Sequence, residues 1–251
     1  MPPSIDSMTE SLPADNSRTD VIGILGGMGP AATADFYTKL VASTPATRDQ
    51  EHPRVVIWAD PTIPDRSQAL LGNGEDPTPW LIRGIDKLTA AGATVIVIPC
   101  NTAHAFLPRL VVGASVPILN MIDLTAAHIK KSYPSVEKVG LLATTGTINS
   151  AIYQHALESY GLNLLTPTDA QGESVMVAIE RIKAGRRDSE TAELLQDSAR
   201  ELCSQGAQVV IAGCTEIVLG LPSNLIDVPL IDPSQVVVDS LLARMGYSIP
   251  E

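Results

Sequence analysis

An internal repeat constrains the fold of this 251-residue chain more than any other feature of its sequence. Residues 91–103, AGATVIVIPCNTA, are echoed by residues 205–217, QGAQVVIAGCTEI; in both copies a cysteine follows the glycine by eight positions. Upstream, VIGILGGMGPAAT at 21–33 parallels KVGLLATTGTINS at 138–150, and downstream SVPILNMID at 115–123 parallels DVPLIDPSQ at 227–235. The repeat predicts two halves of similar size with the same order of elements.

Short β-branched apolar runs alternate with longer amphipathic segments throughout both halves, as is typical of βαβ units on a parallel sheet. The predicted strands are residues 21–25, 54–58, 94–98, 116–119, 138–142, 162–165, 208–212 and 228–231. The predicted helices are residues 30–43, 79–91, 102–111, 122–131, 150–160, 173–184, 189–205 and 234–245. We therefore expect an α/β protein with two similar Rossmann-like or flavodoxin-like domains, whose parallel sheets are related by a pseudo-twofold axis.

Composition limits the compartment and the partners of such a protein. Residues 1–20 are rich in Pro, Ser, Thr and Asp and have neither the basic start nor the apolar core of a secretory signal, so we expect a disordered tail. No apolar run reaches the roughly 18 residues that would span a bilayer. The chain has 28 acidic against 17 basic residues, which disfavours nucleic acid as a partner. We expect a soluble cytoplasmic protein that does not bind membranes.

Two of the three cysteines occupy equivalent positions in the repeat. Cys100 and Cys214 each fall at the carboxyl end of a predicted parallel strand, the edge at which open α/β sheets bind ligands. The N-terminus of a following helix lowers the pKa of a thiol from its free value of about 8.5. If the halves face each other about the pseudo-twofold axis, the two thiols lie across one cleft and suit two-sided proton transfer.

A buried structural role is the alternative for any cysteine beside an apolar strand. We give that interpretation to Cys203, which lies within a predicted helix. The three cysteines include no CxxC pair and predict neither a disulfide framework nor a zinc site. For Cys100 and Cys214, the matched positions and the polar residues that follow favour function.

Five motifs, in this order and spacing, resemble the aspartate/glutamate racemase family: GILGGMGPAAT, RDQEHP, IPDRS, PCNTAH and AGCTEI. The resemblance runs from about Val21 to the end of the chain and is strongest to the aspartate racemase branch. Glutamate racemases usually carry Asp-Ser in the first loop and Cys-Thr-His at the second cysteine. Here the first loop reads Gly-Gly-Met-Gly-Pro, and the second cysteine precedes Thr215 and Glu216, which favours aspartate.

The resemblance implies a racemase that uses neither pyridoxal phosphate nor a metal. One cysteine, as thiolate, removes the α-proton and the other, as thiol, returns a proton to the opposite face; these are Cys100 and Cys214. Arg66 and Lys183 are implied as carboxylate partners, and a guanidinium can hold a carboxylate at two points. The implied pocket residues are Met28, Gln50, Asn101, Thr102, Thr144, Thr215 and Glu216.

The resemblance also implies a homodimer with the active site in the cleft between two domains. We expect residues 21–120 together with 228–251 to form the first domain and residues 121–227 to form the second. Substrate identity stays open, because Ala59, Asp60 and Ser67 depart from residues that are frequent in relatives. Glutamate or broader amino-acid racemisation, hydantoin racemisation, maleate isomerisation and malonate decarboxylation are alternatives on the same scaffold, as is a catalytically silent binding protein.

Three local features have alternative interpretations. Lys183 could be a solvated lysine at a helix end, and His104 could either assist the neighbouring thiol or belong to the core or a helix surface. Gly27 and Gly29 follow a predicted strand in the outline of a dinucleotide-binding fingerprint, which would indicate hydride transfer. Against this, Asp60 lies 31 residues beyond Gly29 where about 20 is expected, and the paired cysteines would have no role.

Overall fold

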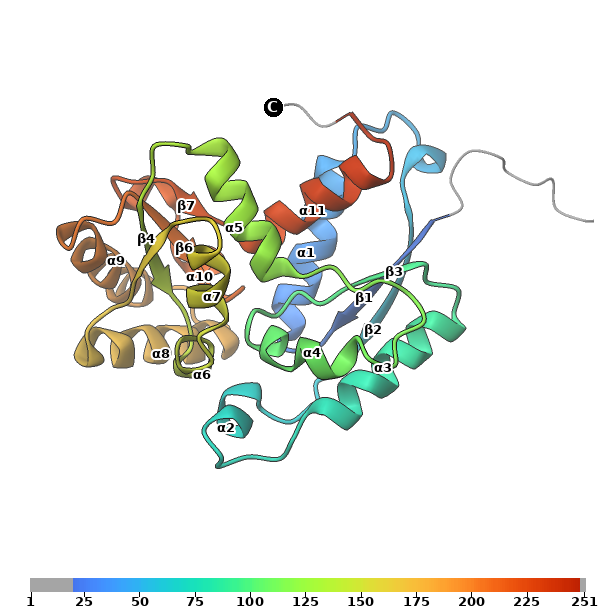
Figure 1. The fold of residues 1–251 in the computed structure, drawn as a ribbon, viewed down its shortest axis with the longest axis horizontal. Helices are drawn as coiled ribbons and strands as arrows, with labels where there is room; N and C mark the ends of the chain where they lie inside the picture. The colour runs from blue at the N-terminus through green and yellow to red at the C-terminus, as the bar shows by residue number, and fades with distance from the viewer. Residues whose placement is uncertain (1–19, 249–251) are drawn as a thin grey trace, which may run out of the picture.

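A computed structural model describes residues 20–248 and contains one parallel sheet in each half of the chain (Figure 1). The first sheet has the order β2-β1-β3 and is built from β1 (Val21–Gly26), β2 (Arg54–Ala59) and β3 (Val95–Val97). The second has the order β5-β4-β6-β7 and is built from β4 (Lys138–Leu142), β5 (Asn163–Leu165), β6 (Val209–Ala212) and β7 (Leu230–Ile231). The expected α/β class with two parallel sheets is confirmed. The tail expected at residues 1–20 lies outside the described residues except for Asp20.

Helices connect the strands in both halves. Those of the first half are α1 (Pro30–Ser43), η1 (Asp49–Glu51), α2 (Arg66–Leu70), α3 (Thr78–Ala90), η2 (Thr102–Phe106), α4 (Leu107–Leu110) and α5 (Met121–Ser132). Those of the second half are α6 (Thr145–Asn149), α7 (Ile152–Glu158), α8 (Asp169–Lys183), α9 (Ser189–Ser204), α10 (Ile217–Gly220), η3 (Ser223–Leu225) and α11 (Pro233–Arg244). Among residues 20–248, no helix is long and apolar enough to cross a membrane.

The two sheets reproduce the sequence repeat in their hydrogen bonds. The Pro229 carbonyl accepts from the Val210 amide at 2.9 Å, and at the equivalent place the Pro117 carbonyl accepts from the Ile96 amide at 2.9 Å. In the second half this contact belongs to β7, but in the first it is an isolated bridge between Ile96 and Ile118. The predicted strand at 116–119 is therefore wrong. β3 ends at Val97, and the segment pairs with it at one residue only.

α5 and α11 occupy equivalent places in the two copies of the repeat, and each of them packs on the sheet of the other half. α5 buries Ile122, Ala126 and Ile129 in the core of the second sheet, and α11 buries Val238 and Leu241 in the core of the first. In Figure 1, α5 and α11 lie side by side between the two sheets. Because each fully buried aliphatic side chain contributes about 1.5–3 kcal/mol, this exchange of helices ties the halves together.

The exchange also defines where the chain returns to the first half. β7 pairs with β6, so Leu230 and Ile231 lie in the second sheet. The Asp232 side chain caps α11 by accepting from the Ser234 amide, just as Asn120 caps α5. We propose that residues 20–120 and 233–248 form the first domain and residues 121–232 the second.

Short elements account for the remaining differences from expectation. The helix predicted at 102–111 is a 3₁₀ segment followed by a single α turn. The helix predicted at 150–160 is shorter and follows α6, with Ala151 in a left-handed conformation between them. α2, α6 and α10 were not predicted, because a helix of one turn carries too few residues to show a 3.6-residue period.

Candidate active site

A small cavity lies between the two halves, at the carboxyl edges of both sheets. It is lined by all of the predicted site residues except Gln50, and also by Asp65 and Ser67. Its volume of about 20 Å³ is room for about one water molecule. The two cysteines, Cys100 after β3 and Cys214 after β6, therefore reach one common space from opposite halves of the repeat.

Gln50 is the predicted residue that the structure places elsewhere. It lies in η1, is exposed, and lines a separate cavity together with Asp20 and Arg54. Asp20 directly precedes β1 and Arg54 begins β2, so this cavity lies at the amino edge of the first sheet, opposite the cysteines. The RDQEHP motif comes just before β2 in the chain, and that position fixes the edge at which Gln50 lies.

The glycine-rich loop after β1 forms one wall of the cavity. Gly27 has a φ of 95°, and a Cβ there would come within 2.4 Å of the Asp60 backbone, so only glycine fits. The adjacent Met28 is buried in the wall. The Asp60 carboxylate accepts from the Thr62 amide and hydroxyl at 2.9 and 2.6 Å. These bonds keep Asp60 within its own turn rather than at a ribose site.

His104 holds the backbone of Cys100 in place. Its Nδ1 lies 2.9 Å from the Cys100 carbonyl oxygen, and its Nε2 lies 3.1 Å from the Met121 amide nitrogen. A carbonyl can only accept and an amide can only donate, so Nδ1 carries the proton and the ring is neutral. Burial lowers the pKa of His104 and favours this form. His104 therefore has a structural place behind Cys100 and does not line the cavity between the thiols.

Hydrogen bonds from the second half reach the two residues that follow Cys100. The Tyr153 hydroxyl donates to Asn101 Oδ1 at 2.6 Å, while the buried Asn101 Nδ2 has no hydrogen-bond partner among the described residues. The hydroxyl of Thr102 lies 3.1 Å from that of Thr144 and 2.8 Å from that of Thr147, and the last two are 3.0 Å apart. This triad of threonines and the Tyr153 bond join the halves beside the first thiol.

Tyr153 and Thr147 were not among the residues predicted from the sequence. Thr144 caps α6 by accepting from the Thr147 amide at 3.2 Å, so the T-x-x-T spacing could have indicated the second threonine. Nothing in the sequence pattern marks Tyr153, because its contact with Asn101 depends on how the halves pack.

Cys214 lies against a carboxylate. Its Sγ donates to Glu216 Oε2 at 3.0 Å, and the Thr215 hydroxyl lies 3.2 Å from the same oxygen. Cys214 and Glu216 are 7% and 2% exposed, so the pair is shielded from water. Burial and the Glu216 carboxylate raise the pKa of Cys214 well above its usual value, against a smaller opposing effect of Lys183. This arrangement favours the thiol form of Cys214.

Arg66 brings a positive charge into the cavity wall without an acidic partner. It is 9% exposed, and its terminal nitrogens donate to the backbone carbonyls of Ile63, Pro64 and Met28 at 3.0–3.2 Å. In the part of the chain that the structure describes, its buried Nε has no hydrogen-bond partner. Within residues 20–248, neither Arg66 nor the exposed Lys183 forms an ion pair. A buried guanidinium without an acid is costly unless an anion binds it.

A larger cavity of about 330 Å³ adjoins the small one and shares part of its wall, including Met28, Arg66, Lys183 and Glu216. Any solute that passes from the larger space to the thiols therefore meets both cations. The 20 Å³ space is too small for an amino acid, so the residues that line it have to move when a substrate binds.

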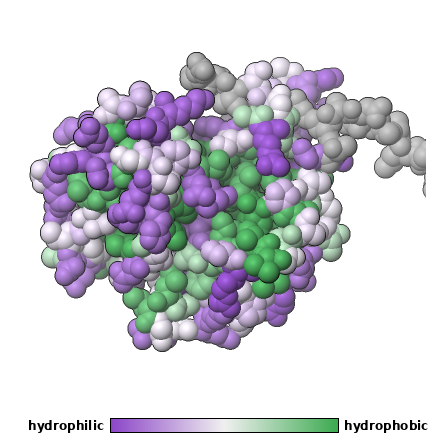
Figure 2. Space-filling view, in the orientation of Figure 1, coloured by the Kyte–Doolittle hydropathy of each residue, from purple (hydrophilic) through white to green (hydrophobic). Residues whose placement is uncertain are grey.

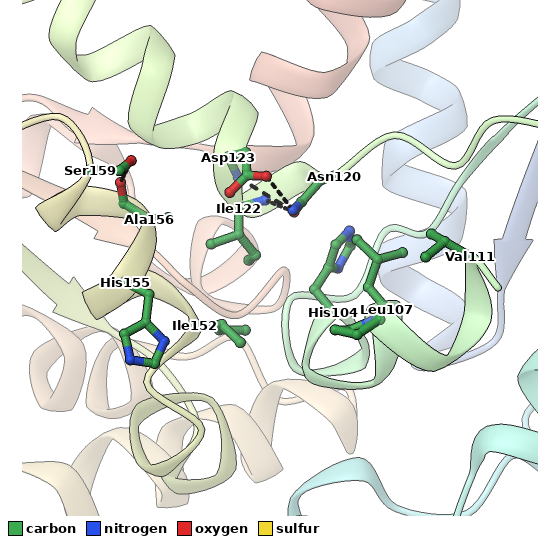
Figure 3. Close-up of a pocket in the computed structure, with 11 residues that line it drawn as sticks. His104, Leu107, Val111, Asn120, Ile122, Asp123, Ile152, His155, Ala156 and Ser159 are labelled. Atoms are coloured by element: carbon green, nitrogen blue, oxygen red, sulfur yellow. Dashed lines mark hydrogen bonds between the residues drawn. The ribbon is translucent and has the colours of Figure 1, made fainter.

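A third cavity, of about 470 Å³, lies on the other side of His104, between α4, α5 and α7. Figure 3 shows Ile152 and His155 of α7 on one side and His104 and Leu107 on the other. In Figure 2, apolar side chains gather on the face over α4 and the segment after it, where Val112 is 86% exposed. This space does not contain the thiols. Within the described range, no group of three or more His, Cys, Asp or Glu side chains could hold a metal ion.

Comparisons with known proteins cover both halves of the chain. A family model described as Asp/Glu/Hydantoin racemase matches residues 25–241, which include both cysteines. The broad specificity amino-acid racemase RacX of Bacillus subtilis is 31% identical over 227 residues, 89% of this chain and 97% of that protein.

Solved structures share the two-sheet architecture. That of the Picrophilus torridus aspartate racemase is 32% identical with a TM-score of 0.83, covering 92% of this chain and 96% of the other. That of an aspartate racemase homologue from Pyrococcus horikoshii is 26% identical with a TM-score of 0.73, covering 90% and 99%. These matches extend over nearly the full length of each protein compared.

Proposed function

We propose that this chain, which belongs to the Asp/Glu/hydantoin racemase family and is a racemase, interconverts L- and D-aspartate by proton transfer between two cysteines. The observation that carries the proposal is that Cys100 and Cys214 line one cavity from opposite halves of the repeat. Two acid-base groups on opposite sides of an α-carbon are what inversion of its configuration requires.

In the proposed reaction, the Cys100 thiolate takes the α-proton of one enantiomer. The S–H bond forms as the C–H bond breaks, and the electron pair stays on the substrate, delocalised into its α-carboxylate. Cys214 then gives its proton to the opposite face and becomes a thiolate. The reverse direction exchanges the two roles, and the pair titrates as a coupled system.

Proton transfer between positioned groups supplies roughly 10²–10⁴-fold acceleration, which is too little for a weakly acidic α-carbon. The remainder has to come from donors that stabilise negative charge on the α-carboxylate in a site closed to water. The unpartnered Asn101 Nδ2 is such a donor, and it adjoins Cys100. The closed state of the cavity supports this role, because charge interactions strengthen when water is excluded.

The cations support a dicarboxylic substrate. A protein of net charge −11 needs local positive charge to hold two carboxylates. Within residues 20–248, the Arg66 Nε in the wall has no hydrogen-bond partner, and Lys183, which lines both cavities, forms no ion pair. The two carboxylates of aspartate match these two cations. A broader amino-acid range is the second candidate, because RacX is similar over 97% of its length.

The direct test is chiral chromatography of L-aspartate, D-aspartate, L-glutamate and several neutral amino acids after incubation with the enzyme. We expect aspartate to approach an equal mixture of enantiomers from either side, with slower or no change of the others. Cys203→Ser, which alters the cysteine of α9, is the matched control and should retain activity, whereas Cys100→Ser and Cys214→Ser should lose it. Wild-type enzyme that racemises no amino acid would overturn the proposal, and equal rates for neutral amino acids would favour the broader range.

We further propose that the enzyme works as a cytoplasmic homodimer. The chain's resemblance to homodimeric racemases supports the assembly, and its acidic, cysteine-poor composition supports the compartment. Sedimentation equilibrium of the purified protein distinguishes a dimer from a monomer.

A further inference from the structure

The two cysteines sit in unequal electrostatic surroundings although the repeat places them at equivalent positions. Two residues after Cys100 the chain has Thr102, whereas two residues after Cys214 it has Glu216. The Thr102 hydroxyl bonds to other hydroxyls, while the Glu216 carboxylate accepts from the Cys214 thiol at 3.0 Å. Within the part of the chain that the structure describes, no carboxylate is hydrogen-bonded to the Cys100 thiol.

Hydrogen bonds and burial hold the Glu216 side chain beside the Cys214 thiol. Its Oε2 receives the Cys214 thiol and lies 3.2 Å from the Thr215 hydroxyl, and its Oε1 faces the first loop, 3.1 Å from the position that a Cβ on Gly29 would take. The side chain is 2% exposed, so it has little room to turn toward solvent. The carboxylate therefore stays against the thiol.

The charged groups around Cys214 act in opposite directions. Glu216 opposes ionisation, Lys183 at the end of α8 favours it, and Arg66, Asp65 and Cys100 complete the titratable groups that line the cavity. The Asp65 carboxylate accepts from the Gln68 amide at 2.8 Å. Glu216 is the acid in direct contact with the thiol, and a second negative charge at 3.0 Å from a buried carboxylate is strongly disfavoured.

We propose that Glu216 is a positioning residue that keeps Cys214 protonated in the free enzyme, so that Cys100 is the resting base. This inference rests on the proposed two-cysteine reaction. The free enzyme is then poised for the enantiomer whose α-proton faces Cys100. The other enantiomer requires the minor form, in which Cys214 is the thiolate.

This asymmetry has a defined kinetic signature. Enantiomers have equal free energy, so kcat/KM has to be the same in both directions. One enantiomer binds only the minor form of the enzyme, so its KM is raised by the reciprocal of that form's population. Its kcat is raised by the same factor, because the enzyme–substrate complex of that enantiomer starts from the less stable protonation state. We expect kcat and KM to be larger together by about tenfold or more for one enantiomer, which corresponds to about one pKa unit of imbalance.

The decisive experiment titrates each thiol by its thiolate ultraviolet absorbance, with Cys203→Ser as the background. In this background, adding Cys100→Ser keeps Cys214 as the single cysteine, and adding Cys214→Ser keeps Cys100 as the single cysteine. Glu216→Gln keeps the shape of the side chain and removes its charge. We expect Glu216→Gln to lower the titration midpoint of Cys214 by about one pH unit or more and to move that of Cys100 less. A Cys214 midpoint that stays or rises would overturn the proposal.

One further variant and one kinetic measurement keep the test decisive. Glu216→Asp retains the charge but moves it away from the thiol by one methylene. We expect its Cys214 titration midpoint to lie between those of wild type and Glu216→Gln. If Glu216→Gln does not fold, an unchanged Cys214 midpoint in Glu216→Asp overturns the proposal. In the otherwise unmodified enzyme, Glu216→Gln should bring the kcat values and the KM values of the two enantiomers toward equality. The titration needs no turnover, so a lowered Cys214 midpoint without any racemisation supports the role of Glu216 and contradicts the racemase proposal alone.

Discussion

The Tyr153 hydroxyl donates to Asn101 Oδ1 over 2.6 Å, which joins α7 of the second half to the residue beside Cys100. Burial raises the pKa of Tyr153, so the hydroxyl stays protonated as a donor. The bond fixes the Asn101 amide and leaves its Nδ2 free of protein partners. The position of the donor that we assign to the α-carboxylate thus depends on a helix in the other half.

Tyr153→Phe removes this bond and leaves a buried amide oxygen unpaired. We expect a loss of about 1–3 kcal/mol in the free energy of unfolding, and a fall in kcat larger than any rise in KM because the Asn101 donor is no longer oriented. Urea unfolding and steady-state kinetics measure the two effects. Tyr160→Phe, at an exposed position after α7, is the control and should change neither. A full-rate Tyr153→Phe enzyme would show that the orientation of Asn101 is unimportant.

Gly146 lies at a close approach between the halves. A Cβ there would come within 2.6 Å of the Ser67 Cα and 2.7 Å of its Oγ, so α6 and α2 could not close to their present distance. We expect Gly146→Ala to lower kcat/KM at least about tenfold, since a displacement of about 1 Å can cost 10²-fold. Gly172→Ala, where nothing lies within 4 Å of the added Cβ, is the matched control. Equal kinetics for the two variants would contradict closure as a requirement for activity.

His104 makes stability depend on pH. Its pKa is lowered in the folded protein, so below the unfolded value of about 6.5 the unfolded chain binds a proton that the folded protein does not. The stabilisation is complete above that pH and declines as the pH falls, by up to about 1.4 kcal/mol per pH unit from this residue. His104→Gln should flatten the dependence of the unfolding free energy between pH 7 and 5. The same change at the exposed His155 should leave the slope intact, and an unaltered slope in both would disprove the assignment.

Arg66 should decide the preference for an acidic side chain. Replacing a charged hydrogen-bond partner costs about 1.5–3 kcal/mol, so we expect Arg66→Gln to reduce kcat/KM for aspartate roughly 10- to 100-fold. If Arg66 binds the side-chain carboxylate, any slow racemisation of alanine should be much less affected. Arg83→Gln on α3 controls for the loss of one positive charge. Equal losses for aspartate and alanine would place Arg66 on the α-carboxylate instead.

The repeat in the sequence was sufficient to predict the two parallel sheets and the meeting of Cys100 with Cys214. Strand ends are marked by local composition, and parallel strands bring their carboxyl ends to one edge. Gln50 was assigned to the pocket from the motif alone, although its place just before the strand predicted at 54–58 puts it at the amino edge of the sheet, opposite the cysteines. The contacts of Tyr153 with Asn101 and of Thr102 with the two threonines of α6 arise where the halves pack, and no local pattern records that packing.

The central claim is that each thiol serves one face of the α-carbon, and deuterium exchange by single-cysteine variants tests it most directly. In deuterated water, the Cys214→Ser variant retains Cys100 as base. It should exchange the α-proton of one enantiomer of aspartate for deuterium without inverting the configuration. Cys100→Ser should do the same, more slowly, with the opposite enantiomer only. Exchange of both enantiomers by one variant, or of the same enantiomer by both variants, would contradict the two-cysteine mechanism.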